Sequence, residues 1–69
     1  MERSSVNSTS IAEIGYDSDT ETLELCFHKG GVYQYENVPA FMYERLMAAP
    51  SIGTFVNVEI RSKFRETRM

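Results

Sequence analysis

This chain has few of the residues on which catalytic and metal sites commonly depend. Its 69 residues include one cysteine, Cys26, one histidine, His28, and no tryptophan. A single cysteine excludes a framework of intrachain disulfides and is typical of reducing compartments, so we expect a cytoplasmic location. The sequence also lacks a run of about 18 apolar residues, so we expect no helix that spans a membrane.

Cys26 and His28 are two residues apart on a predicted strand, so their side chains are expected on the same face. A thiol beside an imidazole is a nucleophile arrangement in principle. The sequence offers no third group to orient the imidazole, and two ligands without a second pair do not make a zinc site. We therefore predict that the protein is not an enzyme and that it holds no metal and no cofactor.

The length of the chain limits it to one domain, so residues 1–69 are predicted to form a single unit. A chain this short buries only about 60% of its unfolded surface, so its core is thin. The polar residues 1–7 and the basic residues 65–69 are expected to be frayed ends.

Alternating apolar residues predict a β-hairpin in the middle of the chain. Leu25 and Phe27 alternate with polar neighbours, and so do Tyr33 and Tyr35. A three-residue loop, Lys29-Gly30-Gly31, pairs Phe27 with Tyr33 and Leu25 with Tyr35, so that all these side chains share one face. Such loops need a residue with positive φ, which glycine adopts without steric cost.

An earlier strand is predicted within residues 8–17, with Ala12, Ile14 and Tyr16 on one side. Pairing Tyr16 with Leu23 keeps the apolar faces of the two strands together. The intervening residues are turn formers whose side chains bond their own backbone.

Two helical segments are predicted after the hairpin. Pro39 suits the first turn of a helix, and the apolar residues that follow have helical spacing: Val38, Phe41, Met42, Leu46 and Ala49. The second segment is less distinct. Val56, Ile60 and Phe64 recur every four residues, but the stretch FVNVEI is rich in strand formers, so propensity alone leaves helix and strand both open.

Several short pieces of the sequence, taken in order, resemble the KTSC family, small domains named for the C-terminus of some lysyl-tRNA synthetases. The family's central Tyr-x-Tyr element matches Tyr33 and Tyr35. The other pieces are Ser10-Ile11, Ile14-Gly15-Tyr16-Asp17, Leu23-x-Leu25-x-Phe27, Val38-Pro39 and Ser51-x-Gly53-x-Phe55-x-Asn57-x-x-Ile60-Arg61.

The resemblance implies that residues 51–64 are helical. The predicted fold is therefore α+β, a three-stranded antiparallel meander with two C-terminal helices packed on one face, in the order ββ-β-α-α. Members of the family also occur as free-standing domains in bacteria and phages. The family's molecular function is not established, and the role suggested for it is RNA binding.

Charge is unevenly distributed along the chain. Residues 61–69 hold four cations and one glutamate, a net charge of +3, whereas residues 1–60 hold three cations and nine acids, a net charge of −6. A basic end on an acidic body suits an anionic partner. Cations at the end of a helix also suit its dipole, so a purely structural interpretation stays open.

The first functional hypothesis is a small non-catalytic module that binds RNA through the basic end of the second helix. Its tyrosines either stack on bases or pack against the helices, and the predicted pairing favours packing. Asn57 and Arg61, at i and i+4, share one helical face, where they hold a phosphate or carboxylate or satisfy the backbone groups of a strand end or helix terminus. The candidate residues are Tyr33, Tyr35, Asn57, Arg61, Lys63 and Arg65.

The alternative hypothesis is a protein-interaction module. The first and third predicted strands are open sheet edges that can pair with another chain. Such a module, of a phage or prophage type, would use an edge or a helix face to bind a host protein, as a monomer or a weak homodimer.

Overall fold

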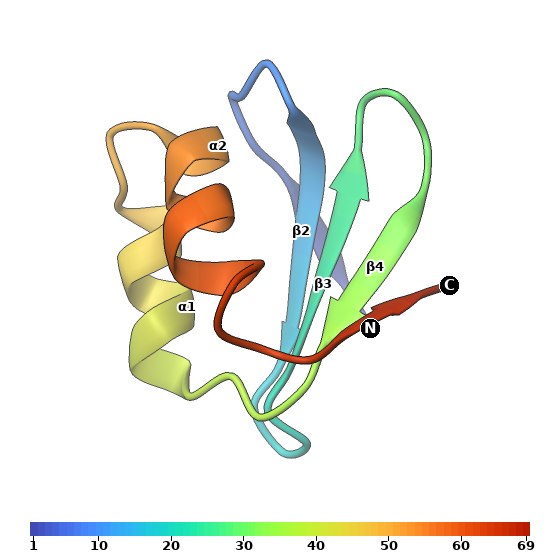
Figure 1. Ribbon diagram of the computed structural model, residues 1–69, viewed down its shortest axis with the longest axis vertical. Coiled ribbons are helices and arrows are strands. Elements are labelled where there is room, and N and C mark those ends of the chain that lie inside the picture. The colour runs from blue at the N-terminus through green and yellow to red at the C-terminus, as the bar shows by residue number, and fades with distance from the viewer.

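The computed structural model describes residues 1–69 and confirms the α+β class. One antiparallel sheet contains five strands, and strands that are consecutive in the sequence are neighbours in the sheet (Figure 1). The strands are β1 (Arg3–Ser5), β2 (Ile11–Asp17), β3 (Thr22–Phe27), β4 (Val32–Tyr35) and β5 (Glu66–Arg68).

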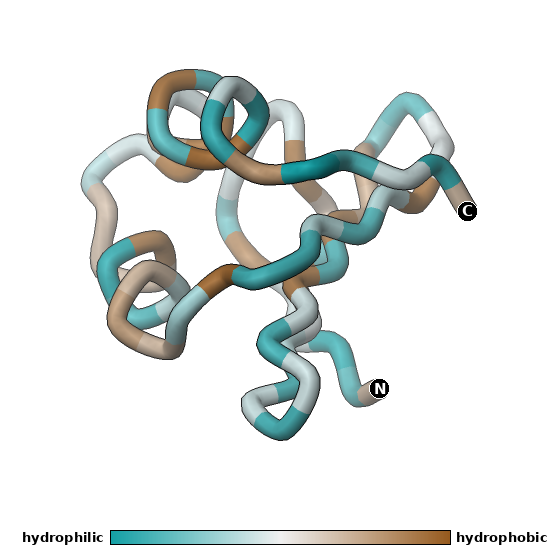
Figure 2. Tube along the Cα trace, turned by 60° about the horizontal axis from the view of Figure 1, so that its bottom comes forward, coloured by the Kyte–Doolittle hydropathy of each residue, from teal (hydrophilic) through white to brown (hydrophobic).

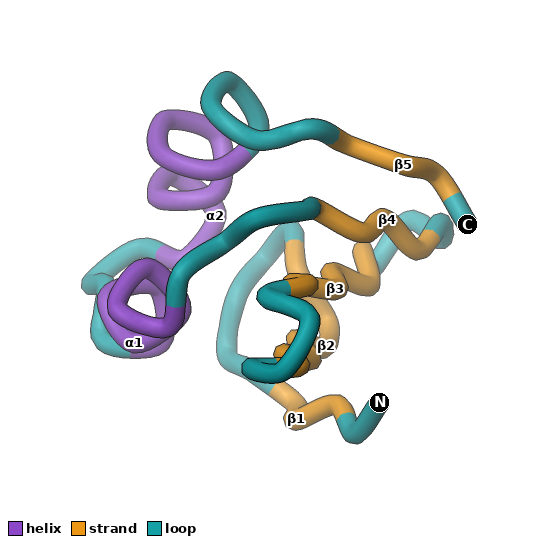
Figure 3. Tube along the Cα trace, turned by 90° about the horizontal axis from the view of Figure 1, so that it is seen from below, coloured by secondary structure: helices purple, strands orange, loops and turns teal.

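The helices form a second layer on one face of this sheet (Figure 3). They are α1 (Ala40–Met47), α2 (Ile52–Phe55) and the π-helical turn η1 (Val56–Ile60), which continues directly from α2. The core lies between the layers, and apolar parts of the trace in both layers supply it (Figure 2). Its buried residues are Ile11, Ile14, Leu23, Leu25, Tyr35, Val38, Met42, Leu46, Val56 and Ile60. None of the helices combines the length and the apolar composition that a membrane-spanning segment needs.

The prediction of three strands is wrong, because both chain ends that were expected to be frayed form strands. β1 pairs with β2, with Arg3 opposite Gly15, and β5 pairs with β4, with Glu66 opposite Tyr35. A Cβ atom on Gly15 would lie 2.8 Å from the carbonyl oxygen of Glu2, so glycine permits the close approach of the first strand. Every residue of β1 and β5 is exposed, so neither has the apolar alternation that reveals a strand.

The central hairpin has the predicted faces but not the predicted partners. Leu25 pairs with Tyr33, and Leu23 pairs with Tyr35, a shift of two residues from the expected register. A shift of two leaves every side chain on its own face, because side chains alternate with a period of two. Leu23, Leu25 and Tyr35 are therefore buried together as expected.

The loop of the hairpin explains the shift. Gly30 N–H donates to the carbonyl of Phe27, and Phe27 N–H donates to the carbonyl of Gly31. The loop therefore has three residues, as predicted, but begins one residue earlier, at His28. Gly30, the last loop residue, has φ of 97°, and Gly31, which follows the loop, has φ of 93°, so both adopt a positive φ that glycine tolerates without steric cost.

Strand β2 departs from regular alternation at its start. Tyr16 pairs with Leu23, as predicted, and Ile14 pairs with Leu25, but the register shifts between Ile11 and Glu13. This bulge places Ile11 in the core, so the assignment of Ala12 to the core face is wrong.

The helices are shorter than predicted. Pro39 caps α1, but Phe41 is 59% exposed and does not belong to the core stripe. The second helical segment is confirmed as helix and not strand, with Ser51 accepting a hydrogen bond from Thr54 N–H. It ends at Ile60 rather than at residue 64, so the basic residues that follow lie on a turn and on the approach to β5.

Candidate anion-binding groove

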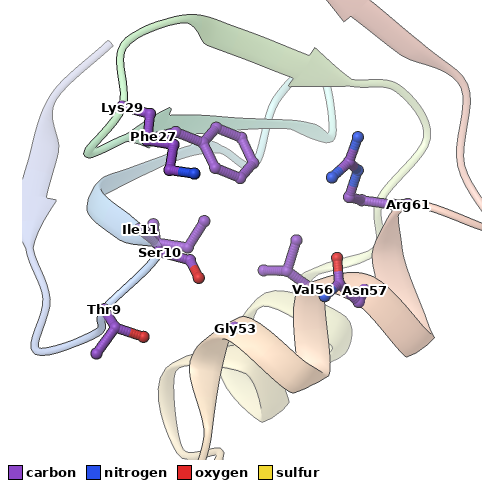
Figure 4. A pocket seen from close by; sticks show the side chains of 9 residues that line it. All are labelled: Thr9, Ser10, Ile11, Phe27, Lys29, Gly53, Val56, Asn57 and Arg61. Carbon is purple, nitrogen blue, oxygen red and sulfur yellow. The ribbon is translucent and has the colours of Figure 1, made fainter.

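A hollow of about 250 Å³ opens between the two layers at one end of the sheet (Figure 4). Figure 4 shows residues that precede and begin β2 on one side, helical residues on the opposite side, and the end of β3 with its loop above them. The lining residues are Thr9, Ser10 and Ile11, then Phe27 and Lys29, then Gly53, Val56, Asn57 and Arg61.

Hydrogen bonds hold the loop before β2 in place. The hydroxyl of Ser8 accepts from the backbone N–H groups of Ser10 and Ile11, at 3.2 and 3.3 Å. The Nε2 of His28 donates to the carbonyl of Ser8 at 2.9 Å, and the backbone N–H of His28 donates to the carbonyl of Ser10 at 3.0 Å. His28 is therefore a structural residue that fixes one wall of the hollow.

Gly53 sets the distance between this loop and α2. A Cβ atom added to Gly53 would lie 3.4 Å from the hydroxyl of Ser10, which is the limit of ordinary contact. A larger side chain would fill the space between Ser10 and the helix. The glycine thus keeps the hollow open at its narrow side.

Arg61 is held at the opposite rim by two contacts. Its Nε lies 3.5 Å from a carboxylate oxygen of Glu66, and its guanidinium carbon lies 5.9 Å from the centre of the Phe27 ring. The same oxygen of Glu66 accepts a hydrogen bond of 2.5 Å from the Tyr35 hydroxyl. Burial of Tyr35, together with this bond to the carboxylate of Glu66, raises the pKa of the tyrosine well above its ordinary value.

Two further hollows share walls with the central one. A hollow of about 370 Å³ shares Thr9, Ser10, Gly53 and Asn57, and polar side chains form its lining apart from Pro50 and Gly53. A hollow of about 190 Å³ shares Phe27, Lys29 and Arg61 and adds Gly30 and the ring of Tyr33. We call these three connected hollows the groove.

The groove contains no aspartate or glutamate among its lining residues, although the chain holds ten acids and has a net charge of −3. Lys29 lines it and forms no ion pair. The hydroxyls of Thr9 and Ser10 and the side-chain amide of Asn57 make no hydrogen bond within the protein. An anion in the groove would therefore meet cations and free polar groups but no carboxylate in its walls.

The structure brings together some of the predicted site residues. Asn57 and Arg61 line the groove, and the ring of Tyr33 lies at its far end. Tyr35 is fully buried, so a stacking role for this residue is wrong and packing is its role.

The other two predicted residues do not line the groove. Lys63 bonds Glu59 at 2.8 Å, and this bond lowers the pKa of Glu59. Arg65 lies 3.6 Å from Glu36. Both cations are thus paired with acids elsewhere on the surface.

The site residues predicted from the sequence did not include Lys29, Thr9 or Ser10. Lys29 lines the groove only because the fold places the hairpin loop across the hollow from the helical residues. The one local signal was Gly53, a glycine inside a helical segment, since such a glycine often marks close backbone approach.

Comparisons with known proteins agree with this architecture. The family model of the KTSC domain matches residues 7–64. The chain belongs to the KTSC domain family. A KTSC domain protein of Yersinia pestis, solved by crystallography, has a TM-score of 0.95 and 38% identity, and the match covers 99% of this chain and 96% of that one.

Two sequence relatives show the contexts in which similar domains occur. A protein of Tsukamurella paurometabola is 40% identical over 60 residues, covering 87% of this chain and 90% of that protein. A lysine–tRNA ligase of Trichormus variabilis is 42% identical over 55 residues, covering 80% of this chain. This KTSC domain corresponds to only 10% of the length of that ligase.

Proposed function

We propose that this KTSC domain is a small binding module for RNA and that the groove is its binding surface. The observation that supports the proposal is the charge of the groove, where Lys29 and Arg61 face free polar groups and no acid lines the walls. Phosphate groups are the anions that such a surface suits, since Lys and Arg contacts to phosphates dominate the affinity of proteins for nucleic acids. A similar segment in proteins named lysine–tRNA ligase is consistent with an RNA partner.

The site in this proposal differs from the one expected from the sequence. The sequence pointed to Lys63 and Arg65, which lie outside the groove and are paired with Glu59 and Glu36. Arg61 is also paired, with Glu66, but it lines the groove. The groove replaces them with Lys29, which the hairpin supplies, and keeps Arg61. The positive region is therefore a tertiary feature and not the basic tail as such.

The number of cations sets the expected affinity. Two groove cations make few phosphate contacts, so the dissociation constant should be on the order of 10⁻⁴–10⁻⁶ M at physiological salt. For a single strand, two contacts give a slope of about −1.4 for log K against log salt concentration. A much steeper slope would require cations outside the groove.

Amide NMR titration with a short single-stranded RNA at low salt tests the proposal. The amides of Lys29, Asn57 and Arg61 should shift, and Lys29→Gln should weaken binding and reduce the salt slope by about 0.7. Lys63→Gln is the matched control, because it removes the same charge at an exposed residue outside the groove. Equal loss in both variants, or no shift at millimolar RNA, would contradict the proposal.

The protein-interaction alternative rests on one observation. An apolar hollow of about 330 Å³ lies on the helical layer beside Phe55 and Val58, and Val58 is 55% exposed. The sheet edges are less available than expected, because β1 and β5 cover the strands that the prediction left open and are only three residues long. Val58→Asp should abolish capture of a protein partner and leave RNA titration unchanged.

A further inference from the structure

The two ends of the groove differ in chemistry, and this difference bears on which nucleic acid it takes. At one end the lining is uncharged and polar, with the free hydroxyls of Thr9 and Ser10 and the free amide of Asn57. At the other end the lining consists of the rings of Phe27 and Tyr33 together with Lys29, Gly30 and Arg61. The two cations thus line both this end and the central hollow, and neither lines the polar end.

The aromatic end presents two rings to a flat group, and the guanidinium carbons of Arg61 and Arg68 lie 5.9 Å from the centres of Phe27 and Tyr33, so a base that stacks there also meets a cation. The rings of Phe27 and Tyr33 are 5.5 Å apart and nearly perpendicular, at 85°, and neither is fully buried. Open space lies beside Gly30, where an added Cβ would meet nothing within 4 Å. A nucleobase that stacks there must be free of a complementary strand, since the bases of a duplex are already stacked and paired.

The polar end suits a neutral group that both donates and accepts hydrogen bonds. Hydroxyl and amide groups can donate hydrogen bonds to a phosphate, but a phosphate uses only their donors, whereas a sugar hydroxyl can use both their donors and their acceptors. The 2′-hydroxyl is the group by which a protein distinguishes RNA from DNA. The side chains of Thr9, Ser10 and Asn57 make no hydrogen bond within the protein, so all three are available to a 2′-hydroxyl.

We infer that the groove binds a short single-stranded segment of RNA, with its base, phosphate and ribose in a fixed order along the groove. A base lies on Phe27 and Tyr33, the adjoining phosphate lies between Lys29 and Arg61, and a ribose hydroxyl lies on Thr9, Ser10 and Asn57. The inference rests on the proposed function and adds to it a preference for single strands over duplex and for RNA over DNA.

The experiment compares four labelled ligands of one sequence: single-stranded RNA, its 2′-O-methyl form, the corresponding DNA, and duplex RNA. Fluorescence anisotropy at low salt should rank the single-stranded RNA first. Loss of one hydrogen bond should weaken binding of DNA and of the 2′-O-methyl form by about 2- to 10-fold. Duplex RNA should bind more weakly than the single strand of the same length.

Variants at the polar end of the groove distinguish recognition of the ribose hydroxyl from binding of any nucleic acid. Thr9→Val and Ser10→Ala should reduce affinity for RNA and leave affinity for DNA unchanged, so that the two ligands converge. Thr67→Val and Ser18→Ala are the matched controls, since both residues are exposed and lie outside the groove.

The outcomes are distinct for the two proposals. Equal binding of RNA and DNA, still reduced by Lys29→Gln, would overturn the ribose assignment and leave a nucleic-acid site in the groove. Tighter binding of duplex RNA would overturn the single-strand assignment. Failure of all four ligands to bind would overturn the proposed function itself.

Discussion

The hydroxyl of Tyr35 donates a hydrogen bond of 2.5 Å to the carboxylate of Glu66, which joins the buried face of β4 to the last strand of the chain. The two residues also face each other across the β4–β5 ladder. Because the same carboxylate lies 3.5 Å from Arg61, this one bond connects the core, the chain end and the rim of the groove. It also gives a structural reason for a tyrosine at a position where phenylalanine would fill the core equally well.

Replacing Tyr35 with phenylalanine should destabilise the domain. The variant keeps the buried ring but removes a donor to a charged group, a bond that contributes about 1.5–3 kcal/mol. We expect the lower end of this range, because a third of the Glu66 side chain is exposed to water. Urea unfolding measures the change. Tyr33→Phe is the control, since the Tyr33 hydroxyl makes no hydrogen bond, and an equal loss in both variants would contradict the assignment.

The same bond predicts a dependence of stability on pH. Burial and the bond to Glu66 raise the pKa of Tyr35 in the folded protein above its ordinary value of 10.0. Above pH 10 the unfolded chain therefore loses this proton while the folded protein keeps it, so the free energy of unfolding falls as pH rises. Below that pH the contribution is complete.

Alkaline pH acts on the whole chain and not on Tyr35 alone, so the comparison must be made between variants. The difference in stability between the parent and Tyr35→Phe should be constant up to about pH 9 and should shrink above pH 10. Chemical denaturation at a series of pH values measures it. A difference that is flat up to pH 12 would show that the raised pKa does not contribute to stability.

The alternation of residues in the sequence predicted the core of the sheet because burial on one face imposes a period of two. This is why Leu23, Leu25 and Tyr35 were assigned to the correct face even though the register was displaced by two residues. Arg3–Ser5 and Glu66–Arg68 carry no such period, since their side chains are exposed on both faces. Their pairing depends on backbone hydrogen bonds and on the close approach at Gly15, neither of which has a local pattern.

Some residues of the candidate site were predictable from the sequence, and others were not. Asn57 and Arg61 were predicted to share a helical face by their spacing, and both line the groove. Lys29 and Thr9 join them only through the fold, from a hairpin loop and from the segment before β2. Tertiary placement of this kind leaves no signal in the order of residues.

The two loop glycines should differ in their tolerance of a side chain. Both have positive φ, so alanine at either position is strained, at a cost of about 1 kcal/mol. At Gly31 the new Cβ would also lie 3.2 Å from the ring of Tyr33, whereas nothing lies near a Cβ at Gly30. Thermal unfolding should therefore show a larger loss for Gly31→Ala than for Gly30→Ala. The reverse order would contradict the packing of Tyr33 against the loop.

Removing the charge of Glu66 should strengthen RNA binding. The carboxylate neutralises part of Arg61 at the rim of the groove, so Glu66→Gln leaves the guanidinium more available to a phosphate. An exposed ion pair contributes about 0.2–1 kcal/mol, which corresponds to a gain in affinity of roughly 1.5- to 5-fold. The glutamine oxygen still accepts from the Tyr35 hydroxyl, so the strand should remain in place.

Glu36→Gln is the matched control, because it removes the same charge beside Arg65, outside the groove. Anisotropy titration with single-stranded RNA should show the gain only for Glu66→Gln. The same gain in both variants would mean that net charge governs binding, and the assignment of Arg61 to the site would then be wrong.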